Sequence, residues 1–218
     1  MRSLMTAATG MHAQQLNVEV ISNNIANLDT TGFKRQRAEF VDLLYQDEKR
    51  VGTQSADNGD VVPSGVQIGV GVKAAGVYRM MEQGALEPTD NPFDMAINGR
   101  GFFQITLPSG DTGYTRAGSF QLSPDGTLVT NDGFVVQPNI TIPQEAITVT
   151  INQSGEVLVT LDGQVDPANV GQINLSTFAN EAGLNAIGDN LFLETTASGA
   201  PASGTPGTPG LGTIQQGF

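Results

Sequence analysis

The chain contains no cysteine, so its fold uses neither disulfide bonds nor thiolate metal ligands. No stretch approaches the run of about eighteen apolar residues that a membrane-spanning helix needs. Near the start, Gly10, His12 and Gln14 interrupt the chain before the apolar core of a signal peptide can form. We therefore expect no cleaved signal peptide, which fits a cytoplasmic protein or one exported by a route that reads no such signal.

Basic residues are also scarce. Ten lysines and arginines stand against 22 aspartates and glutamates, which gives a formal net charge of −12. Residues 1–50 hold six basic and six acidic residues, so the whole excess lies in the rest of the chain. Nucleic acids bind basic surfaces, and the run from Lys34 to Arg37 is too short to reverse an acidic body. We therefore expect no nucleic-acid partner and no insertion into a membrane.

What the sequence does contain is an N-terminal stripe of apolar residues in alternating three- and four-residue steps, interrupted only at Gln14. This spacing is typical of a coiled-coil seam and predicts a long helix over residues 3–27 of an assembly segment 1–30. The seam consists of Leu4, Ala7, Met11, Val18, Ile21, Ile25 and Leu28. No second helix of comparable length can be read, so we expect the seam to be an assembly interface. The alternative is a surface helix that packs on its own domain.

A polar run follows the seam and overlaps its end. Serine and asparagine compete with the helical backbone for hydrogen bonds, so four such residues among six predict a helix end. Beside a coiled-coil seam, amide side chains can also fix the register of the helices. The run comprises Ser22, Asn23, Asn24, Asn27, Thr31, Gly32, Phe33 and Lys34.

The rest of the chain has the pattern of β structure. Residues 31–72 read as an extended linker or hairpin with a polar insert at 46–65. Residues 73–197 carry regular turn signals between β-branched residues, which predicts an all-β, barrel- or sandwich-like domain. Alternation there places Ile147, Val149 and Ile151 on one face. Residues 198–218, rich in proline and glycine, predict a linker. The predicted fold class is mainly β with an N-terminal α-helix.

Nothing in the sequence selects a catalytic centre. A Gly-x-Ser-x-Gly nucleophile elbow and a phosphate-binding loop are both absent, and His12 is the only histidine. The turns at 125–126 and 131–133 lack the alternating aspartates of calcium loops. Paired carboxylates for glycoside chemistry stay open, because no pair can be singled out. We expect no enzyme activity, no cofactor and no metal site.

Several longer motifs resemble those of the bacterial flagellar rod/hook axial protein family. The N-terminal helix with the run from Ser22 to Lys34 resembles the motif that opens these proteins. The segment Asn91–Phe103, continued by Tyr114–Phe120, is similar to the motif that begins the β domain of hook and rod subunits. Within the family the chain is most similar to the distal rod type, on the motifs at residues 1–11, 37–45, 63–72 and 188–195.

The resemblance implies a structural subunit of the basal-body distal rod, which polymerises into a hollow helical drive shaft that transmits torque and conducts exported subunits. It implies as partners further copies of the chain, proximal rod and hook subunits, and the surrounding ring bushing proteins. The implied location is the periplasmic part of the basal body, reached by type III export.

The resemblance also implies a C-terminal heptad helix beyond residues 210–218, which we expect to be missing either from a fragment or from a shortened protein, and a bracing role for the insert 46–65. Two alternatives stay open. One is another axial subunit, either proximal rod or hook, and the other is an extracellular β-rich adhesin or binding module.

Overall fold

The computed structural model describes residues 2–49, 64–164 and 166–218. The chain forms two compact units, and each is discontinuous in sequence. Unit 1 comprises Met1–Leu28 and Arg35–Met80, and unit 2 comprises Asp29–Lys34 and Met81–Phe218. The backbone therefore passes between the units three times, after residues 28, 34 and 80.

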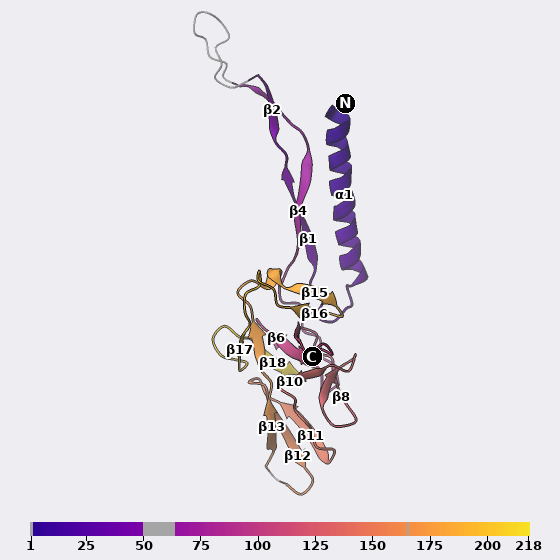
Figure 1. Ribbon diagram of the computed structural model, residues 1–218. Coiled ribbons are helices and arrows are strands. Elements are labelled where there is room, and N and C mark those ends of the chain that lie inside the picture. The colour runs from indigo at the N-terminus through magenta and orange to yellow at the C-terminus, as the bar shows by residue number, and fades with distance from the viewer. Residues whose placement is uncertain (1, 50–63, 165) are drawn as a thin grey trace, which may run out of the picture. The chain divides into compact units, whose positions relative to one another are not determined.

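Unit 1 consists of one long helix and two pairs of antiparallel strands (Figure 1). Its elements are α1 (Arg2–Ala26), β1 (Gln36–Asp42), β2 (Tyr45–Lys49), β3 (Val66–Gly69) and β4 (Val72–Arg79). Strand β1 pairs with β4, with a β-bulge between Glu39 and Phe40, and β2 pairs with β3. Because β4 pairs with β1 in unit 1, the second part of unit 2 begins at Met81 and not at the expected residue 73. Of the predicted insert 46–65, residues 50–63 lie outside the described residues.

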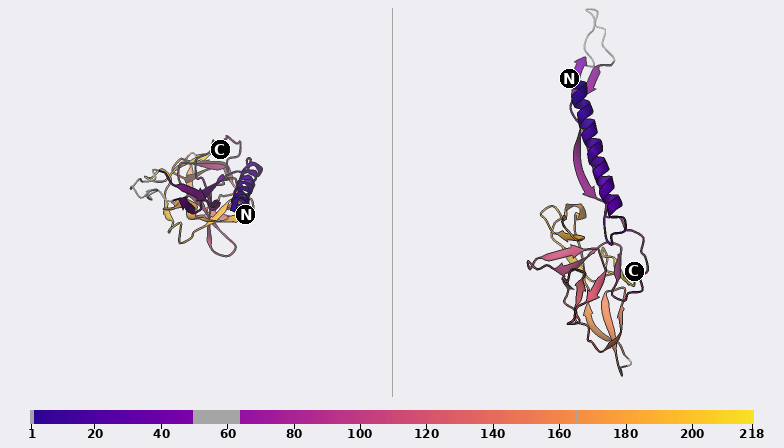
Figure 2. Two further views of the ribbon diagram at one scale, coloured as in Figure 1. Left: turned by 90° about the horizontal axis from the view of Figure 1, so that it is seen from above. Right: turned by 90° about the vertical axis from the view of Figure 1, so that its right-hand side faces the viewer.

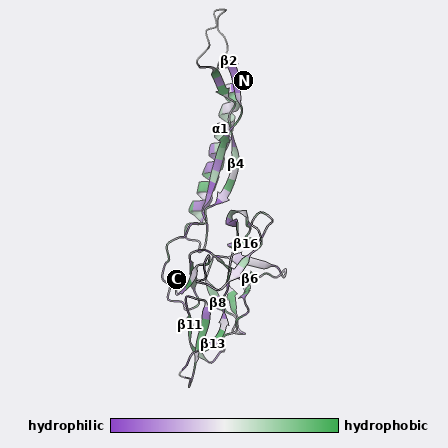
Figure 3. Cartoon of the chain, turned by 90° about the vertical axis from the view of Figure 1, so that its left-hand side faces the viewer, coloured by the Kyte–Doolittle hydropathy of each residue, from purple (hydrophilic) through white to green (hydrophobic). Residues whose placement is uncertain are grey.

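Helix α1 confirms the helix predicted over residues 3–27 and is the only α-helix among the described residues. It ends before Asn27, where side-chain amides compete for the backbone hydrogen bonds of a helix. The helix lies along β1 and β4 in each view (Figures 1 and 2), and Ala13 and Val20 are buried. Hydrophobic and hydrophilic positions are interleaved along its length (Figure 3).

Unit 2 is built from β-sheets and one short 3₁₀ turn, η1 (Glu181–Gly183). Its strands are β5 (Met95–Asn98), β6 (Phe102–Thr106), β7 (Thr112–Thr115), β8 (Phe120–Leu122), β9 (Leu128–Thr130), β10 (Val135–Gln137), β11 (Ala146–Ile151), β12 (Glu156–Leu161), β13 (Ala168–Gln172), β14 (Leu175–Thr177), β15 (Asn185–Gly188), β16 (Leu191–Leu193), β17 (Ala202–Gly204) and β18 (Thr213–Gln216).

The main sheet of unit 2 has nine strands. Seven follow the order β15-β16-β7-β6-β10-β9-β8, and β14 pairs with both β6 and β17. Strands β11, β12 and β13 form a second sheet, and β18 pairs with β5. The seven-strand path has separate ends at β15 and β8, so the expected all-β domain is an assembly of sheets that does not close into a barrel.

Two hydrophobic clusters fill unit 2, and consecutive residues of β6 supply both. Successive side chains of a strand point to opposite faces, so Phe102 and Phe103 enter different clusters, each with no exposed surface. Phe103 meets Phe120 edge to face at a centroid distance of 5.2 Å, and Phe102 meets Phe178 at 5.8 Å. Aromatic pairs favour this geometry, and β6 thus contributes one phenylalanine to the hydrophobic cluster on each face of the sheet.

The C-terminal residues form strands where the composition predicted a linker. Ile214 in β18 pairs with Ile97 in β5 and has no exposed surface. The Gln216 amide donates to the carbonyl oxygens of Pro92 at 2.7 Å and Val149 at 3.0 Å, and accepts from the Ile151 N–H at 2.9 Å. The buried Ile214 side chain and the three hydrogen bonds of the Gln216 amide thus stabilise this segment, although it is rich in proline and glycine.

Candidate assembly interface

Six of the seven seam residues lie on the exposed side of α1, and Leu28 is exposed just beyond the end of the helix. The side chains of Leu4 and Leu28, at the two ends of the seam, are 72% and 80% exposed. Several large apolar side chains exposed along one helix are typical of an interaction surface. The structure therefore leaves the predicted interface open within unit 1.

The other side of α1 packs on the ribbon formed by β1 and β4. Ala13 and Val20 are buried there, and the Val72 N–H donates to the Thr9 hydroxyl at 3.3 Å. The helix therefore packs on its own chain, which was the alternative considered from the sequence, but it uses a different face from the seam. Packing on the ribbon and association through the seam are compatible.

Asn24, one of the motif residues, joins the end of α1 to the start of β1. Its Nδ2 donates to the carbonyl oxygen of Gln36 at 2.8 Å, and its Oδ1 accepts from the Gln36 N–H at 2.8 Å. The amide thus pairs with the strand as another strand would. This contact gives a physical reason for asparagine at this position, beyond ending a helix.

The remaining motif residues divide between the two units. In unit 1, Ser22 and Asn23 are exposed, and the Asn27 amide donates to the Asn23 carbonyl oxygen at 2.9 Å. In unit 2, the Thr31 carbonyl oxygen accepts from the Asn190 amide at 2.8 Å, and Phe33 is half-buried.

Gly32 has φ of +73°, and a Cβ atom there would lie 2.7 Å from the backbone nitrogen of Ala117. Only glycine fits this combination of conformation and close approach. The second half of the motif therefore anchors the chain to the β domain.

Lys34, the last motif residue, lies in a group of cations in unit 2. Its ammonium donates to the Glu82 carbonyl oxygen at 2.6 Å. Burial, followed by repulsion from Arg116, lowers the pKa of Lys34 from 10.5 to about 8. Arg116 donates to the carbonyl oxygens of Gly99 at 2.7 Å and Gly101 at 3.1 Å. The run that ends at Lys34 and the motifs Asn91–Phe103 and Tyr114–Phe120 therefore meet around Arg116.

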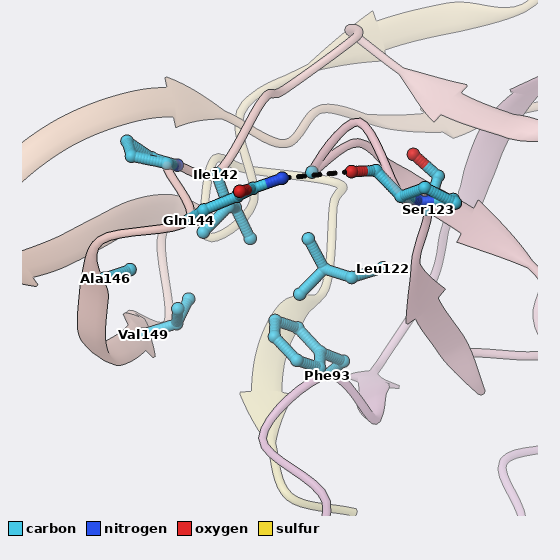
Figure 4. A pocket seen from close by; sticks show the side chains of 10 residues that line it. Phe93, Leu122, Ser123, Ile142, Gln144, Ala146 and Val149 are labelled. Carbon is cyan, nitrogen blue, oxygen red and sulfur yellow. Dashed lines mark hydrogen bonds between the residues drawn. The ribbon is translucent and has the colours of Figure 1, made fainter.

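Unit 2 also contains an open cavity of about 330 Å³ with mainly apolar walls. Phe93, Leu122 and Val149 point toward its centre from three separate segments (Figure 4). The Gln144 amide spans one side by donating to the Pro124 carbonyl oxygen at 3.3 Å. The one hydroxyl of this lining, that of Ser123, lies 2.7 Å from the Thr127 hydroxyl oxygen, and the lining contains no acidic, basic or histidine side chain.

The part of the chain that the structure describes holds no group of three potential metal-ligating side chains. In the same residues, no helix combines the length and the hydropathy of a membrane span. His12 is exposed on α1.

Sequence reasoning missed the ribbon face of α1. The signal was present, because Thr6, Ala13, Val20 and Asn27 repeat every seven residues. Only two of these four residues, Ala13 and Val20, are apolar, so their pattern is weaker than that of the seven-residue seam.

Two family models match the chain. The model of the flagella basal body rod protein matches residues 4–34, and that of the flagellar hook protein FlgE/F/G D1 domain matches residues 96–159. The flagellar basal-body rod protein FlgG of Caulobacter vibrioides is 62% identical over 216 residues, which are 99% of this chain and 82% of that protein. The chain belongs to the FlgG family.

A second FlgG, from Agrobacterium fabrum, is 50% identical over 218 residues, or 100% of the chain and 83% of that protein. The flagellar hook protein FlgE of Helicobacter mustelae is 43% identical over 138 residues, or 63% of the chain and 30% of that protein. The likeness to FlgG thus spans both units, and this family is that of the structural subunit of the flagellar distal rod.

The matched regions agree with the divided motif. The rod model spans α1 and the run up to Lys34, so it includes the whole seam and the Asn24 contact. The D1 model lies within unit 2. For the FlgG family, residues 4–34 therefore form one sequence motif that serves two structural units.

Proposed function

We propose that this chain acts as a non-catalytic subunit of the distal rod and polymerises through the seam of α1. The observation that carries the proposal is the exposure of all seven seam residues, six of them on a helix whose other side is already packed on β1 and β4. Burying each large seam side chain is worth about 1.5–3 kcal/mol. Six such side chains give roughly 9–18 kcal/mol, which is of the same order as the cost of about 4–15 kcal/mol for docking two subunits.

In the proposed assembly, identical subunits make heterologous contacts that do not close, which produces an open helical polymer. The polymer is a hollow shaft that transmits torque and conducts exported subunits. The proposed partners at its ends are proximal rod and hook subunits, and ring proteins surround it. The proposed location is the periplasmic part of the basal body, after export without a cleaved signal peptide. Family membership and the extent of the FlgG match support this reading.

Replacing one seam residue by a charged residue tests the proposal. Ile25→Asp, in the gene that encodes this chain, is expected to abolish rods and swimming, because it places a carboxylate in a buried subunit contact. The matched control is Ile147→Asp in β11, since Ile147 is 64% exposed and Ile25 is 67% exposed. Electron microscopy of basal bodies and swimming in soft agar are the measurements.

The folded state of the purified variants must be checked in the same experiment. Because Ile25 is exposed, its replacement should leave the melting temperature of the chain unchanged within the error of the measurement. A strain that swims normally with Ile25→Asp would show that the seam is not the assembly interface.

A further inference from the structure

The charge of the protein is concentrated in unit 2. This unit holds fifteen acidic and three basic residues, so its net charge of −12 equals that of the whole chain, and unit 1 is neutral. Neighbouring copies in a homopolymer must bring such units together in spite of their mutual repulsion. The position of the few cations in unit 2 is therefore informative.

All three basic residues of unit 2 gather around the carboxylate of Glu181, and we call them the cation cluster: Lys34, Arg100 and Arg116. Arg100 forms an ion pair with Glu181 at 2.9 Å. Lys34 and Arg116 interact electrostatically with the same carboxylate. The Glu82 carboxylate also attracts the charge of Lys34. All three cations thus act on the Glu181 carboxylate.

Arg116 and Lys34 are more buried than Arg100, and they contact mainly uncharged groups. The Arg116 guanidinium donates to backbone carbonyl oxygens and to Oε1 of Gln83 at 2.9 Å, and lies 5.9 Å from the centroid of Phe102. The Lys34 ammonium has three N–H donors, and the Glu82 carbonyl oxygen takes one of them.

A buried cation without a full counter-charge is unfavourable, and a nearby carboxylate relieves the cost. The lowered pKa of Lys34, caused by burial and by Arg116, agrees with a site that is short of negative charge. In a polymer of acidic units, the cation cluster is where a carboxylate of a neighbouring unit 2 is attracted and not repelled.

We propose that the cation cluster receives an aspartate or glutamate side chain from unit 2 of a second copy of this chain. The contact rests on the proposed function, because it requires polymerised subunits. It would neutralise the excess of positive charge inside one subunit and part of the acidic surface of the next. The side chain of Arg100 is 63% exposed, so its guanidinium gives the incoming carboxylate an accessible partner.

A zero-length carbodiimide crosslinker tests this contact directly. It joins an amine to a carboxylate that touches it by forming an amide bond, and the water lost in that step converts the carbodiimide to a urea. Isolated basal bodies and the monomeric chain are treated side by side, digested and analysed by mass spectrometry. Links from Lys34 to Glu82 or Glu181 are expected in both samples. A link from Lys34 to any other acidic residue of unit 2 is expected only in basal bodies.

Rods that contain the chain but show only the two links within one subunit would overturn the proposal. Basal bodies without the chain would overturn the proposed function and this contact together, so the two failures are distinguishable. A second outcome concerns rods that give no crosslink from Lys34 to a neighbouring subunit. If inorganic phosphate then raises the melting temperature of the wild type but not of Lys34→Met, the cation cluster binds a free anion. That result would also overturn the proposal.

Variants supply an independent measurement. Lys34→Met is expected to reduce the number of rods per cell about tenfold or more, whereas Lys34→Arg keeps the charge and should retain rods. The matched control is Lys73→Met, which removes an exposed lysine of unit 1. Unchanged melting of unit 2 in Lys34→Met separates lost assembly from lost folding. Equal numbers of rods in Lys34→Met and the wild type would contradict the inference.

Discussion

Replacing Ile214 by alanine should destabilise unit 2 by about 3 kcal/mol. Ile214 has no exposed surface and belongs to the larger hydrophobic cluster, opposite Ile97. Isoleucine-to-alanine changes at such positions cost about 2–5 kcal/mol, because transfer free energy is lost and a cavity remains. For a unit of this size, a loss of about 3 kcal/mol lowers the melting temperature by roughly 6–12 °C. Ile147→Ala, at an exposed position, should change stability by less than about 0.5 kcal/mol.

Tyrosine fluorescence can follow unit 2 alone. The chain has no tryptophan and three tyrosines, of which Tyr45 and Tyr78 lie in unit 1 and the buried Tyr114 lies in unit 2. In a background of Tyr45→Phe and Tyr78→Phe, the emission therefore comes from Tyr114. Urea titrations of this background, with and without Ile214→Ala, give the free energy difference from the shift of the midpoint.

A destabilisation below about 1 kcal/mol would refute this reasoning. It would mean that β18 is not part of the core of unit 2. Residues 198–218 would then behave as the linker that their proline and glycine content predicts.

Three further predictions concern single residues. Asn24→Ala removes both hydrogen bonds to the Gln36 backbone, so we expect a loss of about 1–3 kcal/mol, seen as faster amide exchange at Gln36. Gly118→Ala places a Cβ atom 1.6 Å from a backbone carbonyl oxygen and should prevent unit 2 from folding, whereas Gly84→Ala meets open space and should melt normally in the same circular-dichroism scan. Because the pKa of Lys34 is lowered from 10.5 to about 8, the folded chain releases a proton that the unfolded chain keeps. Stability should therefore rise between pH 8 and 10.5, by less than about 1.4 kcal/mol per pH unit since the amine is half-buried, and urea midpoints should lose this rise in Lys34→Met.

The helix and its seam were predictable because their signal is long and periodic. Apolar positions at heptad spacing predict a helix, and α1 matches the predicted range 3–27 to within one residue at each end. Turn signals likewise predicted the all-β character of unit 2, in which β12 carries the buried Val157 and Val159. These features depend on residues that are close in sequence.

The features that were not predicted depend on distant residues or on a local irregularity. The register of β11 shifts between Ala146 and Thr148, so Ile147 is exposed although simple alternation placed it with Val149 and Ile151. Strand β18 depends on β5, far away in the sequence, and composition alone cannot reveal such a partner. The meeting of Lys34 with Arg116 has the same origin.

The three passages of the backbone between the units have a mechanical consequence. A domain attached by one strand of chain can swivel, because rotation about single bonds of the backbone meets little resistance. Three tethers, after residues 28, 34 and 80, cannot all swivel freely, since turning one unit winds the tethers around one another. In the proposed shaft, three covalent connections would therefore link unit 1 to unit 2. Cutting a single tether would leave the units joined but would weaken their resistance to twist.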